Sequence, residues 1–243
     1  MWSSNSVYAC RYTALSMIPL RDNEIRQGLP IVTWTLIIVN CIIFLWGRQG
    51  HIFGPEITFA DLAMRPKEVV GAFQNSGDRF PIVTIFTAMF LHANLMHLLG
   101  NMIFLLVFGA GVEEALGAAR YALYYLFWGI VATATHIFVD PSSIVPILGA
   151  SGAIGGVLGA YFMLYPANKV EIIIPVFFFV STVVSAWVLL GLWFVWQVLI
   201  PQQNVANWAH AGGFLAGMLT VLIMGGRATV LKNRARQFDY DFE

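Results

Sequence analysis

Long apolar runs with almost no charge dominate the sequence and restrict its fold class. Residues 141–226 contain two charged side chains, Lys169 and Glu171. Over the whole chain 58% of residues are hydrophobic and 11% are charged, whereas soluble proteins carry about 25% charged residues. Several runs approach the roughly 20 residues with which a helix crosses the hydrocarbon core of a bilayer. The sequence therefore predicts an all-α, polytopic integral membrane protein embedded in the lipid bilayer.

Six apolar segments are candidates for membrane-spanning helices. Residues 47–81, between the first two of them, are expected to form a long folded loop at the membrane interface, and residues 109–120 a short polar turn. Residues 172–179 are a candidate interfacial segment. The six predicted spans are residues 31–46, 94–108, 121–139, 151–165, 181–200 and 208–224.

This reading divides the chain into an N-terminal cytoplasmic segment (1–30), a transmembrane core (31–226) and a C-terminal cytoplasmic tail (227–243). We expect no cleavable signal peptide, because residues 1–16 contain no apolar core, and we expect these residues to be dispensable. The two cysteines show no paired spacing, so no disulfide framework is expected. A net charge of zero and the lack of a long basic stretch predict no nucleic-acid partner.

Basic residues near the span ends set the expected orientation, because loops rich in Lys and Arg stay in the cytoplasm. Six spans put both termini on one side, with nine basic residues against four on the other. The nine are Arg11, Arg21, Arg26, Arg120, Lys169, Arg227, Lys232, Arg234 and Arg236; the four are Arg48, Arg65, Lys67 and Arg79. Both termini are thus predicted to be cytoplasmic, and spans two, four and six begin on the outer side. The compact six-span form and the lack of an organelle-targeting segment lead us to expect a bacterial cytoplasmic (inner) membrane.

One serine lies among small residues where the fourth predicted span begins, in the stretch Gly149-Ala-Ser151-Gly152-Ala-Ile-Gly155-Gly156. The glycine spacing is typical of helices that cross closely in membranes. Taken alone, this motif favours a packing face with an incidental serine. Polar residues inside a membrane segment are nevertheless functional candidates by default, so Ser151 is also a candidate nucleophile.

A serine nucleophile needs a base, and His210 near the start of the sixth span is the available one. Both residues lie at the outer ends of spans that run in the same direction, so topology places them at similar depth. The fourth and sixth predicted spans contain no Asp or Glu, which favours a Ser151–His210 dyad over a triad. The alternative is an interfacial histidine bound to a carbonyl group or water.

His97 and Asn101 are four residues apart and share one face of the second span. With the backbone N–H of Ser151 they are candidates for an oxyanion hole, or alternatively for interhelical hydrogen bonding. His92 precedes this helix and is expected to fix the long loop. Four histidines, His92, His97, His136 and His210, are potential metal ligands. They lack both the spacing of a known metal motif and a carboxylate partner, so no metal is expected.

Together these elements resemble the rhomboid family of intramembrane serine proteases over residues 17–226. The matching stretches are Phe86-Thr-Ala-Met-Phe-Leu-His92, His92-x4-His97-x3-Asn101, Gly109-Ala-Gly-Val-Glu113-Glu-Ala-Leu-Gly117 with Arg120-Tyr121, Gly149-Ala-Ser-Gly152 and Ala209-His210-x-x-Gly213. The resemblance implies a bacterial six-span bundle that needs no metal or cofactor.

The resemblance also implies roles for individual residues. Ser151 would be the nucleophile and His210 the general base, while His97, Asn101 and the Ser151 N–H would bind the oxyanion. Structural roles near the site would fall to His92, Gly149, Gly152, Gly213 and Glu113, the last tying the turn after the second span. The sequence departs from the family at Gly155, where many members carry an aromatic ring that stacks on the histidine, and at residues 79–84, which lack a Trp-Arg pair.

The leading functional hypothesis is therefore an endopeptidase that hydrolyses peptide bonds in or next to transmembrane segments of other membrane proteins. The alternative is a proteolytically inactive rhomboid-like protein that binds membrane clients. A transporter is disfavoured, because the sequence shows neither internal repeats nor intramembrane carboxylates for ion coupling. The oligomeric state is left open.

Overall fold

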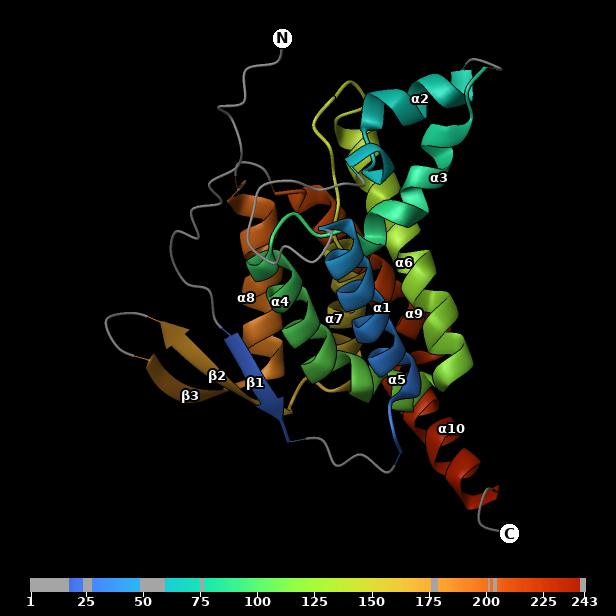
Figure 1. Cartoon of the computed structure of the whole chain (residues 1–243). Helices are drawn as coiled ribbons and strands as arrows, with labels where there is room; N and C mark the ends of the chain where they lie inside the picture. The colour runs from blue at the N-terminus through green and yellow to red at the C-terminus, as the bar shows by residue number, and fades with distance from the viewer. Residues whose placement is uncertain are drawn as a thin grey trace.

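The computed structural model describes residues 18–23, 28–48, 60–74, 77–175, 179–200, 202 and 205–240, and the prediction for residues 1–16 lies outside them. The described chain is mostly helical (Figure 1). Its helices are α1 (Ile31–Gly47), η1 (Ala60–Leu62), α2 (Pro66–Gln74), α3 (Phe80–Thr87), η2 (Ala88–Phe90), α4 (Leu95–Phe104), η3 (Leu105–Gly109), α5 (Ala110–Leu116), α6 (Ala118–Val139), α7 (Ser151–Leu164), α8 (Ala186–Leu199), α9 (Asn207–Ile223) and α10 (Gly226–Tyr240).

Each predicted span corresponds to an apolar helix, although most of these helices are short. Among the described residues, two helical segments are long and apolar enough to cross a membrane, Leu95–Leu116 and Ala118–Val139. A third qualifies if α9 and the start of α10, which are bent by 72° at a short break, count as one span. Six membrane crossings therefore stay a prediction.

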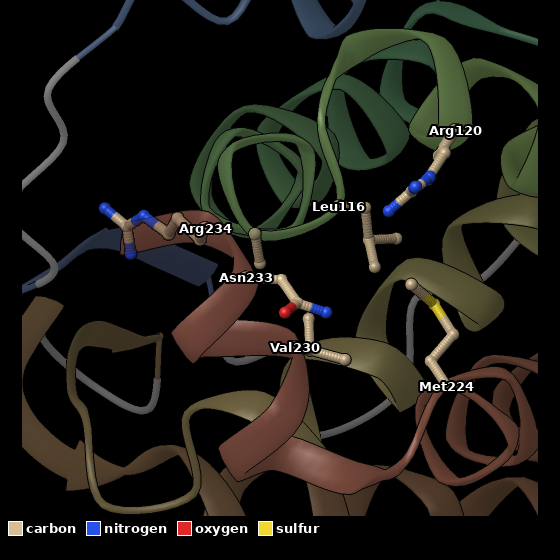
Figure 2. A pocket seen from close by; sticks show the side chains of 7 residues that line it. Leu116, Arg120, Met224, Val230, Asn233 and Arg234 are labelled. Atoms are coloured by element: carbon tan, nitrogen blue, oxygen red, sulfur yellow. The ribbon is translucent and has the colours of Figure 1, made fainter. Parts of the chain in front are cut away.

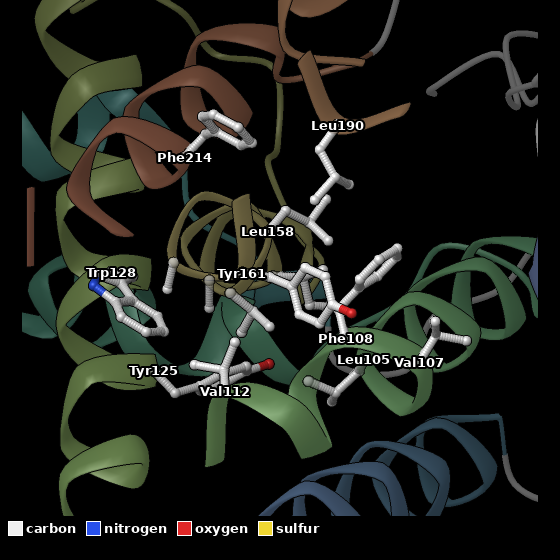
Figure 3. Packing of buried hydrophobic residues seen from close by; sticks show 14 of the residues in the cluster. Leu105, Val107, Phe108, Val112, Tyr125, Trp128, Leu158, Tyr161, Leu190 and Phe214 are labelled. Carbon is white, nitrogen blue, oxygen red and sulfur yellow. The ribbon is translucent and has the colours of Figure 1, made fainter. Parts of the chain in front are cut away.

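Helix α7 is the centre of the bundle. Its residues from Ala153 to Tyr161 are all buried, and Figure 3 shows Leu158 and Tyr161 surrounded by large side chains from neighbouring helices. Bilayer lipid is as apolar as these side chains, so close packing rather than the hydrophobic effect must hold the helices together. The central position of α7 fixes where its first residue, Ser151, can lie.

Glycines bring the backbones of α7 and α9 into direct contact. A Cβ atom added at Gly213 or Gly217 would collide with the carbonyl oxygen of Gly152 or Gly156, respectively. One added at Gly159 would collide with the carbonyl oxygen of Phe214. The glycine spacing around Ser151 indicated a helix that crosses a neighbour closely, and only residues without a side chain permit this crossing at these positions.

The all-α prediction is wrong in one part, because a three-stranded antiparallel sheet lies at the end of the bundle opposite α2 (Figure 1). Strand β2 (Lys169–Pro175) pairs with β1 (Ile18–Asp22) on one side and with β3 (Phe179–Ser185) on the other. Residues 169–174 and 180–184 are rich in Val and Ile, which favour strands. The fifth predicted span consequently begins as a strand, and its helix starts only at Ala186.

The polar turn predicted at residues 109–120 is also wrong. After the π-helical η3, the chain continues as helix α5 to Leu116, and the break falls at Gly117, whose φ of 81° suits glycine. The helix tolerates its carboxylates because they have partners. Glu113 accepts hydrogen bonds from α1, and Glu114 pairs with Arg234 of α10. Most of the predicted C-terminal tail lies in helix α10, and its cytoplasmic location stays a prediction.

The described part of the predicted long loop is largely helical, in η1, α2 and α3. It is attached to the segment before α7, because Met64 and Ile147 exchange both backbone hydrogen bonds, at 2.9 and 2.7 Å. Lys67 N–H also donates to the Ser143 carbonyl group at 3.0 Å. These contacts fix the approach of the chain to Ser151, while the placement of the loop at a membrane interface stays a prediction.

Candidate active site

The first turns of α7 and α9 bring Ser151 and His210 together. Ser151 is the first residue of α7, and His210 lies one turn from the start of α9. The two side chains are joined by a hydrogen bond of 2.8 Å between Ser151 Oγ and His210 Nε2. A serine hydroxyl bonded to an imidazole is the arrangement that an activated nucleophile requires.

The other ring nitrogen of His210 contacts a residue that the sequence analysis did not single out. His210 Nδ1 lies 2.8 Å from Oε1 of Gln197, a buried residue of α8. Asn207 donates to the same oxygen at 3.3 Å, so Oε1 is the acceptor in both bonds. His210 therefore carries its proton on Nδ1, which leaves Nε2 free to accept the Ser151 proton.

The position of Gly155 explains how the site dispenses with an aromatic ring there. A Cβ atom at Gly155 would lie 2.7 Å from the backbone carbonyl oxygen of His210 and 3.4 Å from the backbone nitrogen of Phe214. There is thus no room for a larger side chain. The imidazole instead neighbours a ring from α8, with 5.9 Å between the centroids of His210 and Trp193.

His97 borders the same site from the first turn of α4. Asn94 caps this helix by accepting the His97 N–H at 2.8 Å. His97 Nδ1 accepts the Ala93 N–H at 3.4 Å, so its proton lies on Nε2. A Cβ atom at Gly149, where φ is +128°, would lie 2.8 Å from that Nε2 and 3.5 Å from Ser151 Oγ. The His97 donor and the serine oxygen thus face one spot beside Gly149.

The remaining predicted residues lie around this centre. Asn101 is buried one turn further along α4 and donates to the His97 carbonyl oxygen at 3.0 Å. His92 is buried, and its ring packs edge-on against that of His97 with 5.1 Å between centroids. Gly152 faces α6, since a Cβ there would lie 2.8 Å from the Ala132 Cβ.

Glu113 lies in α5, and the partners of its side chain among the described residues belong to α1 and not to this centre. Its carboxylate accepts the backbone N–H groups of Val32 and Thr33 at 2.9 and 2.8 Å, and the Thr33 hydroxyl at 2.8 Å. It therefore joins α5 to the first turn of α1.

Gln197 was missed because the sequence analysis looked only for a carboxylate as a further partner of His210 and did not consider an amide. A signal was present, since Gln197 is the only amide side chain in residues 181–200, and a polar group in an apolar span is costly without a partner. Trp193 carried no such signal among the other aromatic residues of that span.

A separate cavity of about 170 Å³ lies between α5, α6 and α10. Figure 2 shows the side chain of Arg120 turned toward it and that of Arg234 turned away. Its lining includes none of the predicted site residues. Its lining consists of Ala115, Leu116, Arg120, Met224, Val230, Asn233 and Arg234.

Comparison with known proteins identifies the class to which this fold and site belong. Residues 79–227 match the family model of the rhomboid domain, so the chain belongs to the rhomboid family. It is 34% identical over 232 residues to Rhomboid-like protein 11, chloroplastic, of Arabidopsis thaliana, an alignment that covers 91% of this chain and 77% of that protein.

Two bacterial relatives carry the word protease in their names. Rhomboid protease GluP of Bacillus subtilis (strain 168) is 29% identical over 204 residues, which cover 82% of this chain and 36% of GluP. Putative rhomboid protease YdcA of the same strain is 31% identical over 142 residues, covering 56% of this chain and 66% of YdcA. The chain therefore spans about a third of the length of GluP.

Proposed function

We propose that this protein is an intramembrane serine endopeptidase that cleaves transmembrane protein substrates in or next to their membrane-spanning segments. The observation that carries the proposal is the 2.8 Å hydrogen bond between Ser151 Oγ and His210 Nε2 in a member of the rhomboid family. The protease names of two bacterial relatives support it. Together, Ser151 and His210 form the catalytic dyad.

In this mechanism Ser151 Oγ attacks the carbonyl carbon of the scissile peptide bond while His210 Nε2 accepts the hydroxyl proton. His210 then gives that proton to the leaving amine, and an acyl-enzyme remains. A water molecule, deprotonated by the same nitrogen, releases the second product. One base thus serves both half-reactions, and His210 can be that base because its Nδ1–H tautomer leaves Nε2 free to accept a proton.

The oxyanion is bound in the spot beside Gly149. The Ser151 N–H is one of the free donors at the N-terminus of α7, and the His97 Nε2–H faces the same spot. Asn101 holds the His97 backbone with one amide hydrogen and has a second to offer. The N-termini of α4 and α7 add partial positive charge where negative charge develops.

We further propose six membrane crossings with both termini in the cytoplasm of a bacterial cell. The 14 residues of α7 span about 21 Å, which is less than the roughly 30 Å hydrocarbon core. A helix this short begins below the membrane surface, so Ser151 lies within the bilayer at the outer side. Substrate then reaches it from the lipid and water from outside.

One observation favours a second candidate, an inactive rhomboid-like protein that binds membrane clients. The relative aligned over 91% of this chain is named Rhomboid-like protein 11, without the word protease. The two candidates differ in whether Ser151 reacts.

Reaction of the purified full-length protein with a fluorescent fluorophosphonate, followed by cleavage of a model transmembrane substrate, separates them. Wild type and the control Ser142→Ala, an exposed loop serine, should react and cleave, whereas Ser151→Ala and His210→Ala should do neither. Equal cleavage by Ser151→Ala would end the protease proposal. A folded wild type that binds clients without labelling would favour the second candidate.

A further inference from the structure

The His210 ring needs a partner that holds its tautomer, and the helix that carries it provides no carboxylate. Residues 207–223 contain neither Asp nor Glu, and the same holds for residues 151–164. Gly155, with the α9 backbone against it, has no side chain and no room for one. The partner must therefore come from a different helix.

Gln197 occupies that place from α8. The residue is 7% exposed, and its Oε1 lies 2.8 Å from His210 Nδ1. An amide oxygen can only accept a hydrogen bond, so this contact requires the proton on Nδ1. With the proton on Nε2, two acceptors would face each other at 2.8 Å, and Nε2 would be unable to accept the Ser151 proton.

Asn207, the first residue of α9, fixes the orientation of the glutamine amide. It donates to Gln197 Oε1 at 3.3 Å and to the Gln197 backbone oxygen at 3.2 Å. Its own Oδ1 accepts the Gln202 N–H at 3.2 Å. Rotation of the Gln197 amide by 180° would turn its NH₂ group toward both donors, so the network holds Oε1 toward His210.

A neutral acceptor is suited to this buried position. A carboxylate there would have to lose its hydration among apolar side chains, which costs several kcal/mol without a full charge partner in the resting site. The amide oxygen fixes the tautomer without that cost. It stabilises the imidazolium of the transition state less than a carboxylate would, and this difference can be measured.

We propose that Gln197 is the positioning residue of this site, holding His210 through the Nδ1–H···Oε1 bond so that Nε2 faces Ser151. This role rests on the proposed function for its effect on rate. The tautomer of His210 is a property of the resting protein and does not depend on activity.

The test compares Gln197→Met, which keeps the size and removes the acceptor, with Gln197→Glu, which keeps an acceptor and adds charge. Gln74→Met, at an exposed glutamine of α2, is the matched control. The full-length proteins are purified in detergent micelles, and folding is checked by thermal unfolding. Fluorophosphonate labelling rates are measured across pH, and the imidazole ¹⁵N shifts of His210 are assigned by comparison with His210→Gln.

We expect Gln197→Met to label at least about 10-fold more slowly than wild type, the scale of one net hydrogen bond, and to lose the Nδ1–H tautomer signature. Gln197→Glu should retain labelling with its acid limb at higher pH, because a carboxylate favours the imidazolium. Gln74→Met should match wild type. Wild-type labelling by a folded Gln197→Met, or an unchanged tautomer in it, would overturn the proposal, as would slow labelling by Gln197→Glu with an unmoved acid limb.

The same data separate the failure of this proposal from that of the proposed function. If folded wild type does not label at all but shows the Nδ1–H tautomer, and Gln197→Met loses it, the protease function fails while the positioning of His210 stands. If wild type labels and its His210 tautomer is Nε2–H, the positioning role fails while the protease function stands.

Discussion

Glu113 accepts both the backbone N–H and the hydroxyl group of Thr33, each at 2.8 Å, from a position 80 residues further along the chain. Both residues are buried, at 4% and 0% exposure. Because the first N–H groups of a helix have no partner within it, the Glu113 carboxylate acts as the N-terminal cap of α1. The cap ties the first helix to the end of the α4–η3–α5 segment.

Replacing Glu113 with Ala should destabilise the protein by about 3 kcal/mol, because it leaves buried N–H donors and a hydroxyl group without an acceptor. Thermal or denaturant unfolding in detergent micelles measures the change. Glu68→Ala is the control, since Glu68 lies on α2 with its side chain half exposed and a single ion pair to Arg65 at 3.6 Å. Equal stability of the two variants would contradict the assigned cap.

Gly213→Ala should reduce both stability and labelling of Ser151. The added methyl group would meet the Gly152 carbonyl oxygen, and overpacking of this kind costs about 1–3 kcal/mol. Separation of α9 from α7 would also lengthen the Ser151–His210 contact. Gly71→Ala is the control, because a Cβ there meets no atom of the described residues within 4 Å. Wild-type labelling by Gly213→Ala would show that the dyad tolerates the displacement.

His97→Phe should lower turnover by about 10²–10³-fold, the measured effect of losing one oxyanion-hole donor in a serine protease. The phenyl ring fills the space beside Gly149 without offering the Nε2–H. His97→Gln, which restores an N–H donor, should recover part of the rate. The measurement is kcat on a model transmembrane substrate. If the phenylalanine and glutamine variants lose the same activity, an N–H donor at position 97 does not matter. The proposed oxyanion role of His97 is then wrong.

Tyr161→Phe should cost more stability than Arg21→Ala, although both remove a polar contact of the N-terminal strand region. Tyr161 is fully buried and donates to Asp22 at 2.6 Å, and a bond to a charged group is worth about 1.5–3 kcal/mol. Arg21 pairs with Glu171 at 2.8 Å, but its side chain is 79% exposed, so this pair contributes about 0–1 kcal/mol. Unfolding midpoints of the two variants give the comparison, and a reversed order would refute it.

The fold was predictable from the sequence where periodic apolar runs and glycine spacing decide the packing. The helices around Ser151 and His210 were located because their polar residues interrupt apolar segments. The sheet was missed because residues 172–179 are apolar enough for a membrane-associated helix as well as for a strand. Pairing with β1, which is about 150 residues away, decides in favour of the strand. A local sequence pattern cannot reveal a partner at that distance.

At the candidate site, chain order indicated which helix ends share a side of the membrane but not which side chains meet. Ser151 and His210 were paired on chemical grounds. The contact between His210 and Gln197 depends on how α8 is rotated about its axis, and a helix that is apolar on all sides except at Gln197 gives little sequence signal for that rotation. The polar turn predicted at 109–120 failed for a related reason, because the partners of Glu113 and Glu114 lie in α1 and α10.

The pairing of β1 with β2 sets an order of events during biosynthesis. Arg21 and Glu171 are 150 positions apart, so at 5–20 residues per second a ribosome needs roughly 8–30 s to supply the partner strand. The chain emerging between them contains α1 and the two helical segments that are long and apolar enough to cross a membrane, Leu95–Leu116 and Ala118–Val139, all of them made while β1 has no strand to pair with. Closure of the sheet therefore comes after synthesis of these helices, and the dyad can form only later still, when α9 has been made.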